Sequence, residues 1–135
     1  MKKLLAVSIF VWLSLFSFTA QAGEFHDLRE KILAVRSSMI DLLMHKDSRV
    51  PQQWKAADEK SAAAKAALAA LKSPPGKEAK FTELKTLVKT FLDTRDKELR
   101  EALVGGNEAE AKRILTVVQK ERFLKITALS EDLDK

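Results

Sequence analysis

Residues 24–46 read EFHDLREKILAVRSSMIDLLMHK, and the spacing of their apolar side chains decides the fold class. The main apolar positions recur every three or four residues, at Phe25, Leu28, Ile32, Val35, Met39 and Leu42. This is the period of one face of an α-helix. The face is widened on one side by Leu33, Ile40 and Leu43. The stretch therefore predicts an amphipathic helix of a helical bundle, which ends before Pro51.

Three further stretches, residues 51–72, 77–104 and 107–134, show the same kind of periodicity. The second is rich in alanine, which favours a helix and lets a neighbouring helix approach closely. Two prolines and Gly76 end it, Gly105-Gly106 ends the third, and Asn107 with Glu110 resembles a capping box for the fourth. Their apolar stripes are Trp54, Ala57, Ser61, Ala64, Leu68 and Leu71; Phe81, Leu84, Val88, Phe91, Leu99 and Ala102; and Ala111, Leu115, Val118, Ile126, Leu129 and Leu133. Four helices with short connections predict an all-α, antiparallel up-down-up-down four-helix bundle.

The composition narrows the functional classes. The chain has 135 residues, of which 46% are hydrophobic and 32% charged, with no cysteine and a net charge of +5. Without cysteine, a disulfide scaffold, a thiolate metal centre and a cysteine nucleophile are excluded. The charge excess is too small to indicate a dedicated nucleic-acid-binding protein.

The first 22 residues have the three parts of a secretory signal peptide. Two lysines follow Met1, an apolar run covers residues 4–18, and Ala20 and Ala22 form an A-x-A ending. The alternative is an uncleaved anchor, but the run spans only about 22 Å of helix against a hydrocarbon core of roughly 30 Å. We expect cleavage after Ala22 and a periplasmic or secreted bundle of residues 23–135.

The chain offers little to a metal, a cofactor or a catalytic mechanism. It has neither the C-x-x-C-H motif of haem attachment nor the E-x-x-H motif of di-iron bundles. Its histidines, His26 and His45, lie 19 residues apart on one predicted helix, about 28 Å by helical rise. His45 follows Asp41 by four residues, which allows a weak surface metal site, but a solvated histidine at a helix end is the better interpretation. We therefore expect no cofactor, no metal and no enzymatic activity.

Polar residues interrupt two of the stripes. Arg95 lies four residues after Phe91, Arg122 lies four residues after Val118, and Arg36 flanks the stripe of the first helix. The three arginines suggest one of two arrangements. They hold a small anionic ligand between the helices, or they form a structural polar layer in which Arg95 and Arg122 pair with Glu98, Glu121 or Asp93. We favour the polar layer, since seam arginines in bundles more often fix register than bind ligands.

Several motifs spread over residues 24–135 carry a resemblance to a known family. They are V-R-x-x-M-x-x-L-L from Val35, T-R-D-x-x-L from Thr94, G-N-x-A-x-A from Gly106 and Q-K-E-R-F from Gln119, together with Trp54. This set resembles the four-helix-bundle sensory module of bacterial chemotaxis receptors and related kinases. The resemblance implies a periplasmic bundle that binds a small ligand, or a ligand-loaded protein, at a homodimer interface, with Arg36, Arg95 and Arg122 at the matching positions. Such receptors also carry a second transmembrane helix and an output domain, so we expect a membrane receptor partner rather than signalling by this chain alone.

A second, shorter resemblance implies another function. Residues 115–119 match the L-T-x-x-Q motif of Spy/CpxP-like periplasmic chaperones, which suggests a holdase or envelope-stress protein. A holdase needs a contiguous exposed apolar patch. The flanking side chains available for one are Leu33, Leu43, Leu87, Leu103 and Leu124.

Overall fold

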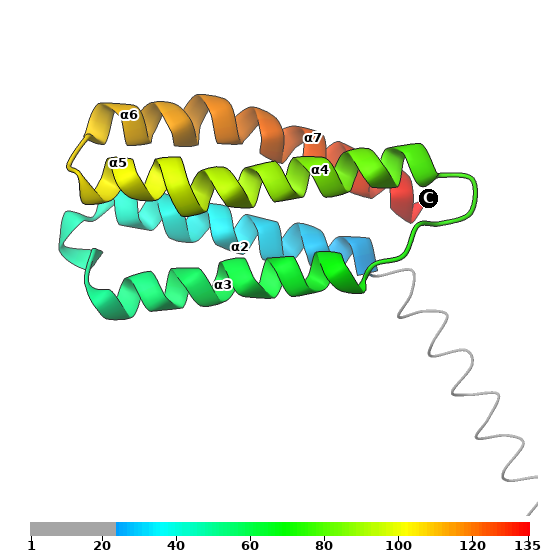
Figure 1. Cartoon of the computed structure of the whole chain (residues 1–135), viewed down its shortest axis with the longest axis horizontal. Helices are drawn as coiled ribbons and strands as arrows, with labels where there is room; N and C mark the ends of the chain where they lie inside the picture. Colours follow the sequence, from blue (N-terminus) through cyan, green and yellow to red (C-terminus); the bar gives the residue numbers. More distant parts are fainter. Residues whose placement is uncertain (1–23) are drawn as a thin grey trace, which may run out of the picture.

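A computed structural model describes residues 24–135, which form an all-α four-helix bundle (Figure 1). The predicted signal peptide and its cleavage site lie outside the described residues. The first two long helices are α2 (Glu24–Met44) and α3 (Pro51–Ala70), joined through a short 3-10 turn at Lys46–Ser48. The third runs through α4 (Glu78–Thr94) and α5 (Arg100–Val104), and the fourth through α6 (Glu108–Arg113) and α7 (Gln119–Asp134). The predicted all-α bundle is confirmed, with boundaries within about two residues of those expected.

The apolar stripe of α2 is buried at every predicted main position. Phe25, Leu28, Ile32, Val35, Met39 and Leu42 are all at most 5% exposed. The stripe predicted for the third helix is buried as completely, from Phe81 to Ala102. On α3, the small residues Ala57, Ser61 and Ala64 are buried, while Trp54 is only half-buried. The core therefore follows the helical period over the first three helices.

The helices begin and end at the turn and capping residues that the sequence predicts. Pro51 occupies the first turn of α3, and Gly106 has φ of +75°, a left-handed conformation that favours glycine. The Asn107 side chain accepts a hydrogen bond from the Glu110 backbone N–H at 3.2 Å and so caps α6. The capping box is only half formed, because the Glu110 carboxylate pairs instead with Arg113.

Two π-helical turns, which periodicity did not predict, interrupt the third and fourth helices. They are Arg95–Leu99, between α4 and α5, and Ile114–Val118, between α6 and α7. Both stand about two helical turns from the Gly105–Gly106 connection, so they lie at similar heights in the antiparallel pair. Each closes wider backbone rings than an α-turn, yet the predicted core positions Ala102, Ile126 and Leu133 beyond the turns are still buried.

The set of buried residues predicted for the fourth helix is partly wrong. We expected Val118 and Leu129 in the core, yet both are half-buried. Gln119 and Ser130, one residue further along in each case, are 1% and 0% exposed. The buried Gln119 Nε2 donates to the Phe91 backbone oxygen at 2.8 Å, which satisfies its amide between the helices.

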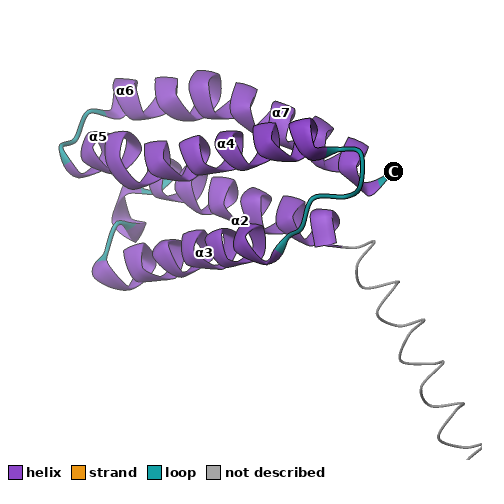
Figure 2. Ribbon diagram, turned by 45° about the vertical axis from the view of Figure 1, so that its right-hand side comes forward, coloured by secondary structure: helices purple, strands orange, loops and turns teal. Residues whose placement is uncertain are grey.

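The four edges of the bundle are not packed equally. Helix α2 packs closely on both α3 and α7, and α4 packs on α7, whereas α3 touches α4 much less (Figure 2). The close approach of the alanine-rich helix is thus realised against α2 and not against α4. Within residues 24–135, no helix is both long enough and apolar enough to span a bilayer.

Candidate functional site

The loosely packed edge between α3 and α4 holds two adjoining cavities, which we call the α3–α4 groove. The cavity nearer the π-helical turn has a volume of about 290 Å³ and is lined mainly by charged side chains. The other has a volume of about 350 Å³ and an apolar floor. Lys65 lines both, so the two cavities adjoin at this residue. Space remains here because α3 packs closely on α2 and touches α4 much less.

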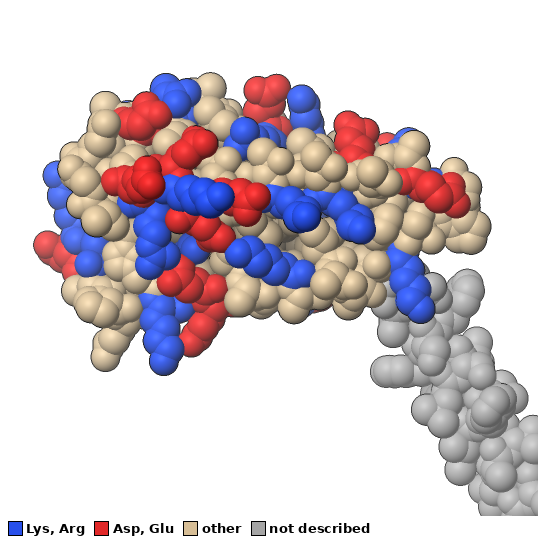
Figure 3. Space-filling model, viewed as in Figure 1, with Lys and Arg blue, Asp and Glu red and all other residues tan. Residues whose placement is uncertain are grey.

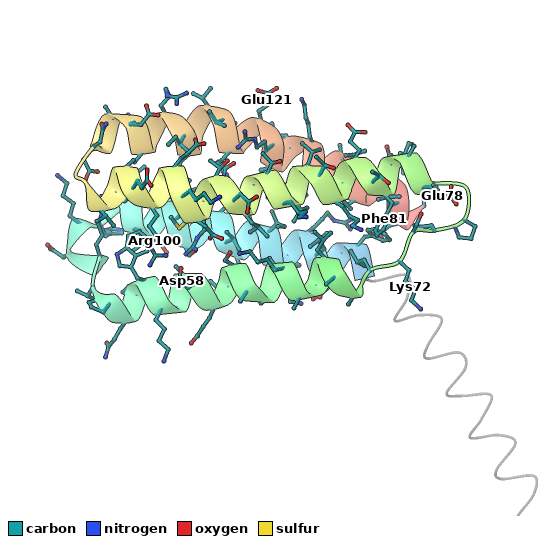
Figure 4. The ribbon with its side chains drawn as sticks, viewed as in Figure 1. Asp58, Lys72, Glu78, Phe81, Arg100 and Glu121 are labelled. Atoms are coloured by element: carbon teal, nitrogen blue, oxygen red, sulfur yellow. The ribbon has the colours of Figure 1, made fainter. Side chains whose placement is uncertain are left out.

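The charged cavity is organised around Arg95, which is 2% exposed. Its Nη2 lies 2.7 Å from Asp58 Oδ1 of α3, and its Nη1 lies 2.7 Å from Asp96 Oδ1. Each carboxylate has a second cation: Arg100 Nη1 at 2.9 Å from Asp58 and Lys65 Nζ at 2.8 Å from Asp96. Figure 4 shows Asp58 and Arg100 pointing toward one another from the facing helices. We call these five residues the Arg95 cluster.

The Arg95 cluster keeps its two carboxylates ionised. Partial burial disfavours the charged form of Asp58, but the hydrogen bonds from Arg100 and Arg95 outweigh it and lower the pKa of Asp58. Partial burial likewise opposes ionisation of Asp96, and contacts with Lys65 and Arg95 lower the pKa of Asp96. The cluster therefore carries three positive and two negative charges at neutral pH.

The Arg95 guanidinium retains hydrogen-bonding capacity. Its Nη1 and Nη2 are engaged by Asp96 and Asp58, whereas the buried Nε has no hydrogen-bond acceptor among the described residues. An unpaired buried N–H costs free energy, and a guanidinium has donors for a planar carboxylate.

The apolar cavity has a floor of three leucines beneath a rim of lysines. Leu68, Leu71 and Leu92 are 7%, 8% and 1% exposed. The rim carries Lys65, Lys85 and Lys89, with Asp93 as its acidic member. Figure 3 shows blue side chains strung along the boundary between α4 and α3. The arrangement places a positive rim over an apolar surface.

The three arginines predicted as a ligand site each have partners of their own. Arg122 donates to Thr94 Oγ1 at 2.7 Å and to Gln119 Oε1 at 3.2 Å. Arg36 lies over the Phe123 ring, with its Cζ 5.2 Å from the ring centroid and its buried Nε without a hydrogen-bond partner. Of the three, only Arg95 lines the groove.

The carboxylates expected to pair with the arginines are not the ones used. In place of Glu98, Glu121 or Asp93, Arg95 pairs with Asp58 and Asp96. Glu121 points away from the bundle in Figure 4 and pairs with Lys125. Asp58 directly follows the buried Ala57, and this position beside the α3 stripe was the available signal for its role.

A third cavity, of about 370 Å³, lies between α2 and α3 and has a mixed polar lining that includes Asp41, His45 and Lys60. His26 faces Glu30, with Nε2 3.8 Å from Oε1. No group of three potential metal ligands occurs in the described part of the chain. The α3–α4 groove differs from this cavity in its excess of positive charge.

Comparison with known proteins identifies no relative of this chain. No family model matches the sequence, and no significant match was found among curated proteins or solved structures.

Proposed function

We propose that this chain is an exported, non-enzymatic ligand-binding module that takes up a small anionic ligand in the α3–α4 groove. Its sensory role rests on the resemblance to chemotaxis-receptor modules, with a membrane receptor as the partner that reads the bound state. The proposed binding position is the α3–α4 groove and not the seam predicted from Arg36, Arg95 and Arg122. Of these three arginines, only Arg95 lines the groove.

One observation supports the proposal above the others. Lys85 and Lys89 stand on the rim of the apolar cavity, and neither forms an ion pair with a described residue. Lys85 instead lies over the Phe81 ring, with Nζ 5.6 Å from its centroid. Because the groove as a whole carries more cations than carboxylates, an anion that enters it meets uncompensated positive charge.

The experiment is thermal melting of the purified protein with a panel of small carboxylates and phosphates at millimolar concentration. A ligand at 100 times its Kd stabilises the folded state by about 2.7 kcal/mol. For a domain of this size that corresponds to a rise in Tm of about 10 °C.

The matched variants change charge equally at two places. Lys85→Gln with Lys89→Gln removes two cations from the rim, whereas Lys112→Gln with Lys120→Gln removes two exposed cations from α6 and α7. We expect the ligand-induced rise in Tm to be lost in the first pair and kept in the second. An equal loss in both pairs shows a response to net charge alone and contradicts a site in the groove.

A further inference from the structure

We infer that the ligand of the α3–α4 groove is an amphiphilic carboxylate, with its head at the lysine rim and its aliphatic tail on the leucine floor. This inference rests on the proposed function and names the chemical class of its ligand.

The floor is built for an apolar group. Leu68 comes from α3, Leu71 directly follows that helix, Leu92 comes from α4, and Ala69 beside them is exposed. The lining of this cavity is more strongly apolar than that of the cavity between α2 and α3. A purely polar anion leaves this surface in contact with water, whereas an aliphatic tail covers it.

The rim fixes the chemistry of the head group. Lys65, Lys85 and Lys89 surround the floor together with Asp93, and of the three lysines Lys65 is already paired with Asp96. The adjoining Arg95 cluster shares Lys65 and adds the positive charge of Arg95 and Arg100. A negatively charged, hydrogen-bond-accepting head such as a carboxylate is complementary to Lys85 and Lys89 on this rim.

The length of the floor limits the tail. Residues 65–71 span about 9 Å along α3, at 1.5 Å per residue. The cavity of about 350 Å³ is at the small end of the range for ligand pockets. A single chain of medium length, such as that of hexanoate or octanoate, fits these dimensions better than a long-chain lipid.

The test is isothermal titration of the purified protein with acetate, butyrate, hexanoate and octanoate, each below its micelle concentration. If the tail lies on the floor, affinity rises about fourfold per added methylene until the floor is covered, the equivalent of ~0.8 kcal/mol per buried CH₂. Octylammonium, which has a similar tail and the opposite charge, is expected not to bind.

A filling variant separates the tail from the head. Ala69→Phe places a ring over the floor from an exposed position, so it removes the gain with chain length without changing any charge. Ala66→Phe, also on an exposed position of α3 but outside the cavity lining, is the control and keeps the gain.

The outcomes distinguish the two proposals. Binding of acetate and octanoate with equal affinity, lost in the Lys85→Gln, Lys89→Gln variant, overturns the amphiphile and leaves the anion site standing. Binding of octylammonium as tightly as octanoate overturns the carboxylate head. Failure of every anion, including inorganic phosphate, to bind overturns both the inference and the proposed function.

Discussion

Removing both carboxylates that neutralise Arg95 tests the arrangement of the Arg95 cluster. Asp58→Asn together with Asp96→Asn leaves a guanidinium whose side chain is 3% exposed without an anionic partner. Breaking a buried pair in this way typically costs about 3–5 kcal/mol, because a buried charge is left uncompensated. Since the Asp58 side chain is 42% exposed, water reaches part of the site, and we take the lower end, about 3 kcal/mol. The corresponding fall in Tm is about 12 °C.

The single variant Arg95→Met behaves differently. Asp58 keeps Arg100 and Asp96 keeps Lys65, so neither carboxylate is stranded. Replacing a buried charge by an apolar chain of similar volume is often neutral, and we expect a change within about 1 kcal/mol. Adding Arg95→Met to the double variant should then recover most of the lost stability.

The assay is urea unfolding, followed by circular dichroism, of the wild type, Arg95→Met, the double variant and the triple variant. The cycle isolates the coupling between Arg95 and its carboxylates. A triple variant that is no more stable than the double variant refutes the reasoning, because the loss then comes from the amides themselves and not from a stranded guanidinium.

Three further predictions follow from the structure. The pKa values of Asp58 and Asp96 are lower in the folded chain than the ordinary value of 3.8. As pH falls through and below 3.8, the unfolded chain therefore binds more protons than the folded chain, and the folded chain loses stability. In urea unfolding at a series of pH values, the Asp58→Asn, Asp96→Asn variant should lose less stability than the wild type over this range. Gly106→Ala should cost roughly 1–2 kcal/mol in the same assay because φ is +75°, and Gly106→Asn should cost less. In a light-scattering assay we expect the protein to suppress the aggregation of an unfolded client only weakly. Of the flanking leucines that could form an apolar patch, only Leu33 and Leu124 are exposed, and Leu103 is buried. Strong suppression at equimolar protein favours the chaperone alternative.

Periodicity predicted the fold and most of the core. On α2 and the third helix, each apolar stripe runs straight, so spacing alone identified the buried side chains. The fourth helix departs from its stripe because the turn at Ile114–Val118 is π-helical. That turn is accompanied by the contact between Gln119 and the Phe91 carbonyl, which belongs to another helix and has no trace in local spacing.

The residues of the candidate site were harder to predict from the sequence than the fold. The position of Arg95 in the seam predicted its burial, but its partner Asp58 depends on how α3 is rotated against α4. The sequence gives no signal that distinguishes Lys85 and Lys89, because lysines are common at exposed positions of helices. Their proposed role depends on the cavity beside them, and that cavity reflects the loose packing of α3 against α4, which local spacing does not reveal.

The most direct test of the groove is a heteronuclear NMR titration of the ¹⁵N-labelled protein with octanoate. The account predicts saturable shifts in the backbone amides of residues 65–71 and 85–93, with little change in the α2–α3 cavity around Asp41 and Lys60. Saturable shifts confined to that cavity, or to the seam around Arg36 and Arg122, contradict the placement of the ligand between α3 and α4.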